Sequence, residues 1–469
     1  MRRVSSLTPA LFLSAGLLLS ISASAPAWAE GSKSDSKPGA FFDNSGSDSS
    51  ALPAAFSETV KKAASKKIEK PNPLANDDRY WVIIDASDKA ARNRIVSAGV
   101  AIEDVRDGKV AGIATPNAIQ KLQELGIGVE RKTALRNIST EDFPKPDESY
   151  HNYSRTEAEL RSIASGNPDI ASVFSIGKTW QGRSIWALRL NTTERGDKPG
   201  KKPGAVFMGS HHAREHLSTE VPLLIARWIV DNRGRADVKK LLETRDVYFI
   251  PMVNPDGAEY DIATGSYRWQ RKNMSKNTDG SVGVDLNRNY SWGWGGAGAS
   301  DYPGDDTYRG PAAFSEPESR AVRDFLSARP NLTTSISYHS FSELVLYPWG
   351  GAEEPISDGR ALKAYKAMAE KMAGWTGYRA MQSSDLYVAT GDSCDWSWGE
   401  RKIFSFTIEL TPRSGGAGGF YPGSKAIGPT VQKNIQPVLY LIALSDDPYR
   451  AAEEGVSEPA SVPSLEVSK

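Results

Sequence analysis

The chain has 469 residues, of which 39% are hydrophobic and 24% are charged, as in an ordinary soluble globular protein. Lysine and arginine together number 57, the same as aspartate and glutamate, so no net charge favours binding to nucleic acid or to an anionic membrane. The single cysteine, Cys394, excludes a disulfide within the chain, and the length allows one large domain with smaller pieces.

The first segment is typical of an export signal. Arg2 and Arg3 precede an uncharged, largely apolar run that ends in the small-residue cleavage pattern AWA at 27–29. We expect residues 1–29 to be a signal peptide and the mature protein to be secreted, without stable membrane association. The alternative is an uncleaved membrane anchor, because the run approaches spanning length, but its serines and the cleavage pattern oppose it. The export route, Sec or Tat, stays open.

Two further segments precede the main domain. Residues 30–75 are rich in Ser, Lys, Asp, Gly and Pro, and we expect a disordered linker there. Residues 76–133 contain strand-like and helix-like stretches in the order β-α-β-β-α-β, which favours a small α+β domain of ferredoxin-like type. This domain has no histidine and no cysteine, so we expect no catalysis in it. The stretch RKTALRNISTEDFPKPDE follows, and its part 134–141 is predicted to be an exposed, cleavable connection.

From 142 to 447 the sequence alternates between apolar strands and helices. Strand-like runs recur at AVFMG, DVYFIPMV, TSISYH and IFSFTIEL, with helical stretches such as TEVPLLIARWIVDN between them. Strands that alternate with helices over roughly 300 residues indicate one α/β domain with a largely buried, mixed sheet. The last residues, 448–469, are expected to form a disordered tail.

Three of the five histidines lie in GSHHAREHLSTE, residues 209–220, between a predicted strand and a predicted helix. Such joins present catalytic loops at the carboxyl ends of strands in open α/β sheets. Two pairs of metal ligands are possible here. His212 and Glu215 have the HxxE spacing, whereas His212 and His216 fit the HxxEH pattern, in which both histidines bind zinc from one helix. The cap-like Ser218 predicts that the regular helix begins later, and this favours the first pair.

Four further segments bring polar groups to strand ends or neighbouring loops: YRWQRKN (267–273), GVDLNRNY (283–290), SYHSFSELVLYPWG (337–350) and SDLYVATGDSCDW (384–396). Together with HARE and the strand IFSFTIEL, they resemble, in order, the motifs of the zinc metallocarboxypeptidases of carboxypeptidase A and B type. The secreted bacterial carboxypeptidase T group is the nearest. The resemblance runs from about Tyr150 to Ser445. It implies the metallocarboxypeptidase fold, a mixed eight-stranded sheet flanked by helices, preceded by a small α+β pro-domain.

The resemblance implies one zinc ion per chain, held by His212, Glu215 and His339. Two neutral imidazoles and one carboxylate leave net positive charge on zinc and an open position for water. Glu409, in FTIEL, matches the family's general base, which takes the proton of the water and later delivers it to the leaving amine. Arg271, in WQRKN, matches the arginine that stabilises the oxyanion.

Further matches imply how the substrate is held. Asn287 and Arg288, in LNRN, match the pair that binds the C-terminal carboxylate of the substrate, a bidentate task that suits guanidinium. Arg214, in HARE, would assist on the path of that carboxylate, and Tyr387 matches the mobile tyrosine that closes over the bound residue. Such residues imply an exopeptidase, because an endopeptidase that used His216 would have no use for them.

The other histidines have weaker cases. We expect His216 to support the site from outside the ligand set or to lie on the helix surface. His211 is expected to be a neighbour of the site, and His151 to be structural.

Asp392 is the residue that we expect to widen the specificity. It falls where carboxypeptidase A types have a small residue, whereas B types place their acid two positions later, at Cys394 here. An aspartate in an otherwise apolar pocket would accept basic and apolar side chains alike, and the alternative is that Asp392 caps a loop. Cys394 is expected to pack as a small apolar group. The other pocket walls are expected from Leu346, Gly350, Ala389 and Thr407.

The resemblance also implies that residues 76–133 are an inhibitory pro-domain that caps the active-site cleft, so that the chain is a zymogen cut by an activating protease. The alternative is a permanent accessory domain. Carboxypeptidase T relatives bind structural calcium, and Asp301, Asp305 and Asp306 are candidate ligands, although their spacing forms no recognisable calcium loop.

We therefore expect a secreted, monomeric zinc carboxypeptidase that acts on peptides or proteins. Two alternatives share the fold. A cell-wall peptide endopeptidase is opposed by the intact LNRN motif and by Tyr387. A non-catalytic peptide-binding module would commonly lack a metal ligand or the base, and this chain has them all.

Overall fold

The computed structural model describes residues 77–135, 147, 149–263 and 267–453. All of them belong to one compact unit, Lys70–Lys469. The predicted signal peptide and the predicted linker lie outside the described residues, as do most of the predicted connection and most of the predicted tail. Within the described part of the chain, no helix is long and apolar enough to span a membrane.

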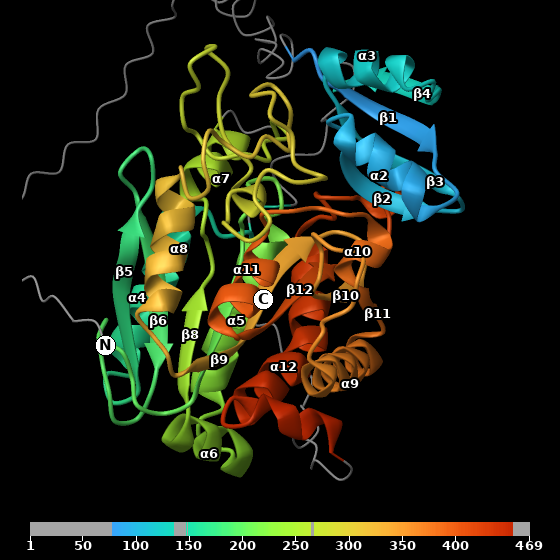
Figure 1. Ribbon diagram of the computed structural model, residues 1–469. Helices are drawn as coiled ribbons and strands as arrows, with labels where there is room; N and C mark the ends of the chain where they lie inside the picture. The colour runs from blue at the N-terminus through green and yellow to red at the C-terminus, as the bar shows by residue number, and fades with distance from the viewer. Residues whose placement is uncertain (1–76, 136–146, 148, 264–266, 454–469) are drawn as a thin grey trace, which may run out of the picture. The chain divides into compact units, whose positions relative to one another are not determined.

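The N-terminal subdomain, residues 77–135, has a four-stranded antiparallel sheet and two helices (Figure 1). Its elements are β1 (Tyr80–Asp85), α2 (Lys89–Ser97), β2 (Ala101–Arg106), β3 (Lys109–Ala114), α3 (Pro116–Glu124) and β4 (Val129–Ala134). Asp88 and Thr115 cap the two helices through their side-chain oxygens. Val82 and Ile84, alternate residues of β1, are fully buried in one core with apolar residues of both helices. The strand order β2-β3-β1-β4 is that of a ferredoxin-like domain, as predicted.

The basic stretch that was expected to be a connection begins inside this sheet. Arg131 and Lys132 pair with Ile83 and Val82 in the β1–β4 ladder, and the strand ends at Ala134. Both residues belong to the stretch IGVERK (127–132), which was expected to be a strand of the small domain, and β4 extends past it by Thr133 and Ala134. The predicted connection 134–141 therefore loses its first residue to β4, and its residues from 136 on lie outside the described part of the chain.

The second part of the structure contains a mixed eight-stranded sheet in the order β11-β10-β12-β9-β7-β8-β6-β5 (Figure 1). The strands are β5 (Ala171–Lys178), β6 (Ser184–Leu190), β7 (Gly204–Met208), β8 (Asp246–Ile250), β9 (Leu332–Ser340), β10 (Leu344–Tyr347), β11 (Arg379–Gln382) and β12 (Phe404–Leu410). The pairs β7–β8, β7–β9, β9–β12 and β10–β11 are parallel, and β5–β6, β6–β8 and β10–β12 are antiparallel. The mixed sheet of eight strands confirms the predicted fold class.

Helices cover both faces of this sheet. They are α4 (Tyr153–Gly166), α5 (Leu217–Asp231), α6 (Ala236–Thr244), α7 (Pro255–Ile262), α8 (Pro317–Ser327), α9 (Gly359–Thr376), α10 (Ser383–Leu386), α11 (Ser393–Arg401) and α12 (Ile427–Leu444). Short 3₁₀ helices lie at η2 (Leu286–Arg288), η3 (Gly415–Ala417), η4 (Ser424–Ala426) and η5 (Pro448–Ala452). The last of these falls in the predicted tail. Tyr449 packs edge-on against Phe404 at 5.1 Å between ring centroids, so the ordered fold extends past residue 447.

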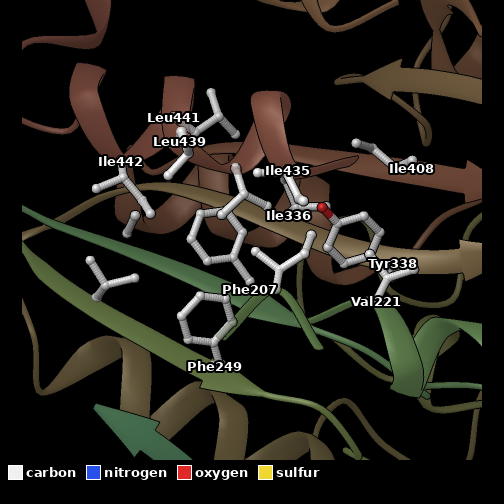
Figure 2. Close-up of a cluster of buried hydrophobic side chains, with 14 of the residues drawn as sticks. Phe207, Val221, Phe249, Ile336, Tyr338, Ile408, Ile435, Leu439, Leu441 and Ile442 are labelled. Atoms are coloured by element: carbon white, nitrogen blue, oxygen red, sulfur yellow. The ribbon is translucent and has the colours of Figure 1, made fainter. Parts of the chain in front are cut away.

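Alternation along the central strands divides the core into two layers. Phe207 belongs to a cluster with α4, α5, α9 and α12, whereas its neighbours Val206 and Met208 belong to a cluster with α8. Figure 2 shows Phe207 and Phe249 on the side of the sheet that faces α12. The centroids of their two rings lie 5.3 Å apart. Strands that are buried on both faces read as continuous apolar runs, and this is why they could be recognised in the sequence.

A buried polar network lies at the end of the sheet where the parallel strand β8 begins. Asp246, at the start of β8, accepts hydrogen bonds from Arg189 Nε at 2.7 Å and from the Tyr248 hydroxyl at 2.8 Å. Asn191 and Asn331 donate to the same carboxylate, at 2.9 and 3.2 Å. Because Asp246 is fully buried, its charge depends on these partners.

Replacement of Asp246 by alanine should lower the free energy of unfolding by about 3–5 kcal/mol, because Arg189 would remain buried without its main partner. Urea unfolding followed by circular dichroism measures the change. Asp169→Ala is the matched control, since it removes an exposed carboxylate that pairs with Arg233, and it should have no measurable effect. Equal stability of the two variants would contradict the assignment.

Candidate active site

The chain leaves β7 by a turn that directs two candidate metal ligands to the end of the sheet. A Cβ atom on Gly209 would lie 1.9 Å from the Ser218 carbonyl oxygen, so this approach requires glycine. The Ser218 hydroxyl donates to the Glu215 carbonyl at 2.6 Å and accepts from the Ser210 amide at 2.9 Å. His212 and Glu215 both precede α5. The HxxEH alternative requires His212 to lie on that helix, and it does not.

Strand pairing places four further side chains in one row. His339 on β9 pairs with Glu409 on β12, Glu409 pairs with Leu344 on β10, and Leu344 pairs with Arg379 on β11. Residues that pair directly across neighbouring strands project from the same face of a sheet. The candidate third ligand, the candidate base, an apolar residue and an arginine therefore line the same cavity.

His212, Glu215 and His339 form a metal-binding arrangement. The Nδ1 atoms of the two imidazoles are 3.1 Å apart, and they lie 2.7 and 3.0 Å from the two Glu215 carboxylate oxygens. Tetrahedral zinc with ligands at about 2.0–2.2 Å needs ligand atoms about 3.3 Å from each other, so the donor set fits zinc. Within the described residues, these three side chains form a group whose ligand atoms lie close enough together to hold a metal ion.

Asp285 links this group to the substrate-binding residues, and sequence reasoning missed it. Its Oδ1 lies 3.1 Å from His212 Nε2, and its Oδ2 accepts from Arg271 Nε at 3.0 Å. A carboxylate on the second nitrogen of a ligating histidine fixes its tautomer and leaves the first nitrogen for the metal. Burial acts to raise the pKa of Asp285, but Arg271 and His212 hold it well below its usual range. Its place directly before LNRN was the available signal.

The candidate carboxylate clamp follows directly from Asp285. This residue caps η2 by accepting from the Asn287 amide at 2.9 Å, and η2 carries both Asn287 and Arg288. Arg288 is fixed by hydrogen bonds from Nε to the Gly298 carbonyl at 3.0 Å and from Nη1 to the Asn287 carbonyl at 2.8 Å. Asn287 and Arg288 line a cavity of about 520 Å³. Arg271, Tyr387, Glu409 and the three candidate metal ligands line the same cavity.

Burial and neighbouring charges shift the pKa of the Glu409 carboxyl and of the Tyr387 hydroxyl, which both line the cavity. Burial and the nearby Glu215 carboxylate raise the pKa of Glu409, and Arg271 and Arg288 act in the opposite direction. Burial also raises the pKa of Tyr387, which therefore stays protonated at neutral pH.

Two of the predicted site residues lie beside this cavity and do not line it. Arg214 is fully buried and donates to Asp306 at 2.8 Å and to Glu103 of the N-terminal subdomain. Asp392 Oδ1 caps α11 by accepting from the amides of Cys394 and Asp395, at 2.8 and 2.9 Å. Its other oxygen, Oδ2, is buried without a hydrogen-bond partner.

The remaining histidines and the cysteine lie outside the ligand group. His216 Nε2 is 2.8 Å from Asp261, and His151 Nδ1 is 2.8 Å from Glu220. His216 is buried, so the expected position on the helix surface is wrong. Cys394 is buried, and burial raises its pKa well above the ordinary value, as expected for a thiol that packs as an apolar group.

The N-terminal subdomain lies against this cavity. Its residues 102–107 line the cavity, and Glu103, besides contacting Arg214, lies 3.9 Å from Arg271 Nη1. Two of the aspartates suggested as calcium ligands hold the same subdomain. Asp305 accepts from the Thr115 hydroxyl at 2.6 Å, and Asp306 accepts from Arg79 at 2.9 Å.

Comparisons with known proteins identify the family of the chain. A sequence model of a family described as zinc carboxypeptidase matches residues 156–437. The chain is 34% identical over 399 residues to a zinc carboxypeptidase of Saccharothrix mutabilis subsp. capreolus, which covers 80% of this chain and 91% of that one. It is also 34% identical over 303 residues to carboxypeptidase B of Bos taurus, covering 63% of this chain and 70% of that one.

The fold is shared with carboxypeptidase A from Helicoverpa armigera, whose crystal structure superposes with a TM-score of 0.62 at 23% identity. The superposition covers 80% of this chain and 98% of that one. Since the family model spans most of the main domain and the Saccharothrix relative aligns over nearly its whole length, the chain belongs to the zinc carboxypeptidase family.

Proposed function

We propose that this chain is the zymogen of a secreted zinc carboxypeptidase that removes single residues from the C-termini of peptides. The observation that carries the proposal is the shared cavity. It holds the His-Glu-His group, a carboxylate beside that group, and the guanidinium groups of Arg271 and Arg288. The apolar run and cleavage pattern of residues 1–29 support export.

In the proposed reaction, Asn287 and Arg288 bind the C-terminal carboxylate of the peptide and so place the last peptide bond beside the metal ligands. Zinc, held by His212, Glu215 and His339, would polarise the scissile carbonyl and lower the pKa of a water molecule when bound. Glu409 removes a proton from the attacking water and then delivers it to the leaving amine.

Two other side chains support these steps. Arg271, held by Asp285, faces the negative charge that develops on the carbonyl oxygen. Tyr387 closes over the bound residue and excludes water from the reacting groups. An endopeptidase on the same fold would have no free carboxylate to bind, so the buried clamp favours exopeptidase action.

Two peptides that differ only in a free or an amidated C-terminus test the clamp. After removal of the N-terminal subdomain, the enzyme should release the last residue of the free acid and leave the amide intact, because an amide gives Arg288 no negative charge. Released amino acid, measured by chromatography, gives the rate. Equal cleavage of both peptides would contradict the proposal.

Glu409→Gln should lower kcat on the free acid by about 10²–10⁴-fold and keep zinc bound.

Asp392 is proposed to give the enzyme its acceptance of basic residues alongside apolar ones. The proposal is supported by the unpartnered, buried Oδ2 atom, which a lysine or arginine side chain could satisfy. The same oxygen lies 3.4 Å from where a Cβ on Gly350 would stand, and Gly350 is an expected pocket wall.

Asp392→Asn should selectively lower kcat/KM for peptides that end in lysine or arginine, by about 10-fold or more, because the buried charge would lose its counterpart. Asparagine still caps α11, so the fold should be unaffected. Turnover of matched peptides ending in Lys, Arg, Leu and Phe measures the effect. An equal loss on the leucine peptide would exclude a role of Asp392 in specificity.

The zymogen proposal rests on Glu103. Its carboxylate contacts Arg214 and approaches Arg271, the guanidinium groups that the substrate would use. While it is in place, a C-terminal carboxylate must compete with it for the same charges. A protease that cuts after β4 would release the subdomain.

Glu103→Ala should raise the activity of the uncleaved chain by at least about 10-fold, because a buried, charge-paired contact would be lost. The measurement is turnover of a free-acid peptide by the intact, zinc-loaded protein. Glu130→Ala is the matched control, since Glu130 belongs to the same sheet but pairs with Lys109 at the surface. Unchanged activity of Glu103→Ala would mean that the subdomain does not inhibit through this contact.

A further inference from the structure

A chain of hydrogen bonds runs from the candidate ligand His339 into the protein interior. The Ser337 hydroxyl oxygen lies 3.1 Å from His339 Nε2 and also 3.1 Å from His211 Nδ1. His211 Nε2 in turn lies 2.9 Å from the Tyr290 hydroxyl. All four residues are buried, so bulk water cannot take the place of a missing partner.

The fold places these groups together from three separate segments. Ser337 and His339 are two residues apart on β9 and therefore project from the same face. His211 precedes the candidate ligand His212 in the β7–α5 turn, and its ring stacks on that of His339, with centroids 5.7 Å apart and planes 16° apart. Tyr290 follows η2.

The donor and acceptor in each hydrogen bond follow from the metal site. If His339 gives the lone pair of Nδ1 to zinc, its Nε2 carries the proton and donates to Ser337. The Ser337 hydroxyl has a single hydrogen, and His211 Nδ1 is placed to accept it. His211 then carries its own proton on Nε2 and donates it to Tyr290.

We propose that His211 is a positioning residue of the zinc site. It holds the Ser337 hydroxyl as an acceptor toward His339 and thereby fixes the tautomer and the ring orientation with which His339 binds zinc. This inference rests on the proposed role of His339 as a ligand. It assigns to the first histidine of HHAREH a function that its sequence position does not indicate.

Zinc affinity of the full chain tests the proposal, measured by competition with a chromophoric chelator. Ser337→Ala should weaken zinc binding by about 10–100-fold, as for other groups that orient a ligating histidine. His211→Leu should weaken it by about 10-fold, because it fills the space but offers Ser337 no acceptor. His211→Asn, whose Oδ1 can stand near the position of Nδ1, should restore most of the affinity.

Ser335→Ala is the matched control. Ser335 lies two residues before Ser337 on the same face of β9, and its hydroxyl is buried without a hydrogen-bond partner. Its loss should leave zinc affinity unchanged. The visible absorption spectrum of the cobalt-substituted protein gives a second readout, and it should change in Ser337→Ala and His211→Leu but not in Ser335→Ala.

Two results would overturn the proposal: a His211→Leu affinity within about two-fold of the wild type, or a His211→Asn affinity as low as that of His211→Leu. A loss in Ser335→Ala as large as in Ser337→Ala would do the same, because it would indicate a general packing effect. Failure of the ligand assignment itself gives a different pattern, in which His339→Ala binds zinc as tightly as the wild type.

Discussion

The buried carboxylate of Asp285 joins the two halves of the active site. One oxygen faces the candidate ligand His212, the other holds Arg271, and the side chain caps the short helix that carries the candidate clamp. A movement of this residue would therefore displace a metal ligand and the substrate-binding groups together. In a buried site such coupling is strong, because each charged group depends on its neighbours in place of water.

The sheet supplies the other half of the geometry. Parallel pairing of β9 with β12 sets His339 beside Glu409, so the distance between ligand and base is fixed by strand register and does not depend on loop conformation. Groups held on strands are more rigid than groups held on loops. Each candidate histidine ligand has a hydrogen-bond partner of its own, Asp285 for His212 and Ser337 for His339. Ser337 in turn lies within hydrogen-bond distance of His211.

The guanidinium groups of Arg214 and Arg271 also face the N-terminal subdomain. Arg214 lies between Glu103 of the subdomain and Asp306 of the main domain, and Asp306 also accepts from Arg79. The subdomain is thus attached through a network of buried charges that reaches Arg271. Because a buried charge without a partner is costly, loss of the subdomain would leave these guanidinium groups in need of an anion, and a peptide carboxylate can supply one.

Much of the chemistry could be inferred from the sequence. The HxxE spacing and the segments around LNRN and HSFSELVLYP indicated the family, and the comparisons confirm the family. The same segments supplied the candidate ligands, the candidate base and the candidate clamp. The long buried strands could also be recognised, because burial on both faces leaves a continuous apolar run. The short strands β10 and β11 could not, since four residues carry too little pattern.

Contacts between residues that are distant along the chain became visible only in the folded structure. The choice between Glu215 and His216 as the partner of His212 depends on where α5 begins, and the turn before that helix contains a close contact between Gly209 and Ser218. Asp285, Glu103 and Ser337 acquire their roles from groups that lie far from them along the chain or on another strand. Local spacing carries no information about such contacts, because they are set by strand register and by the packing of separate segments.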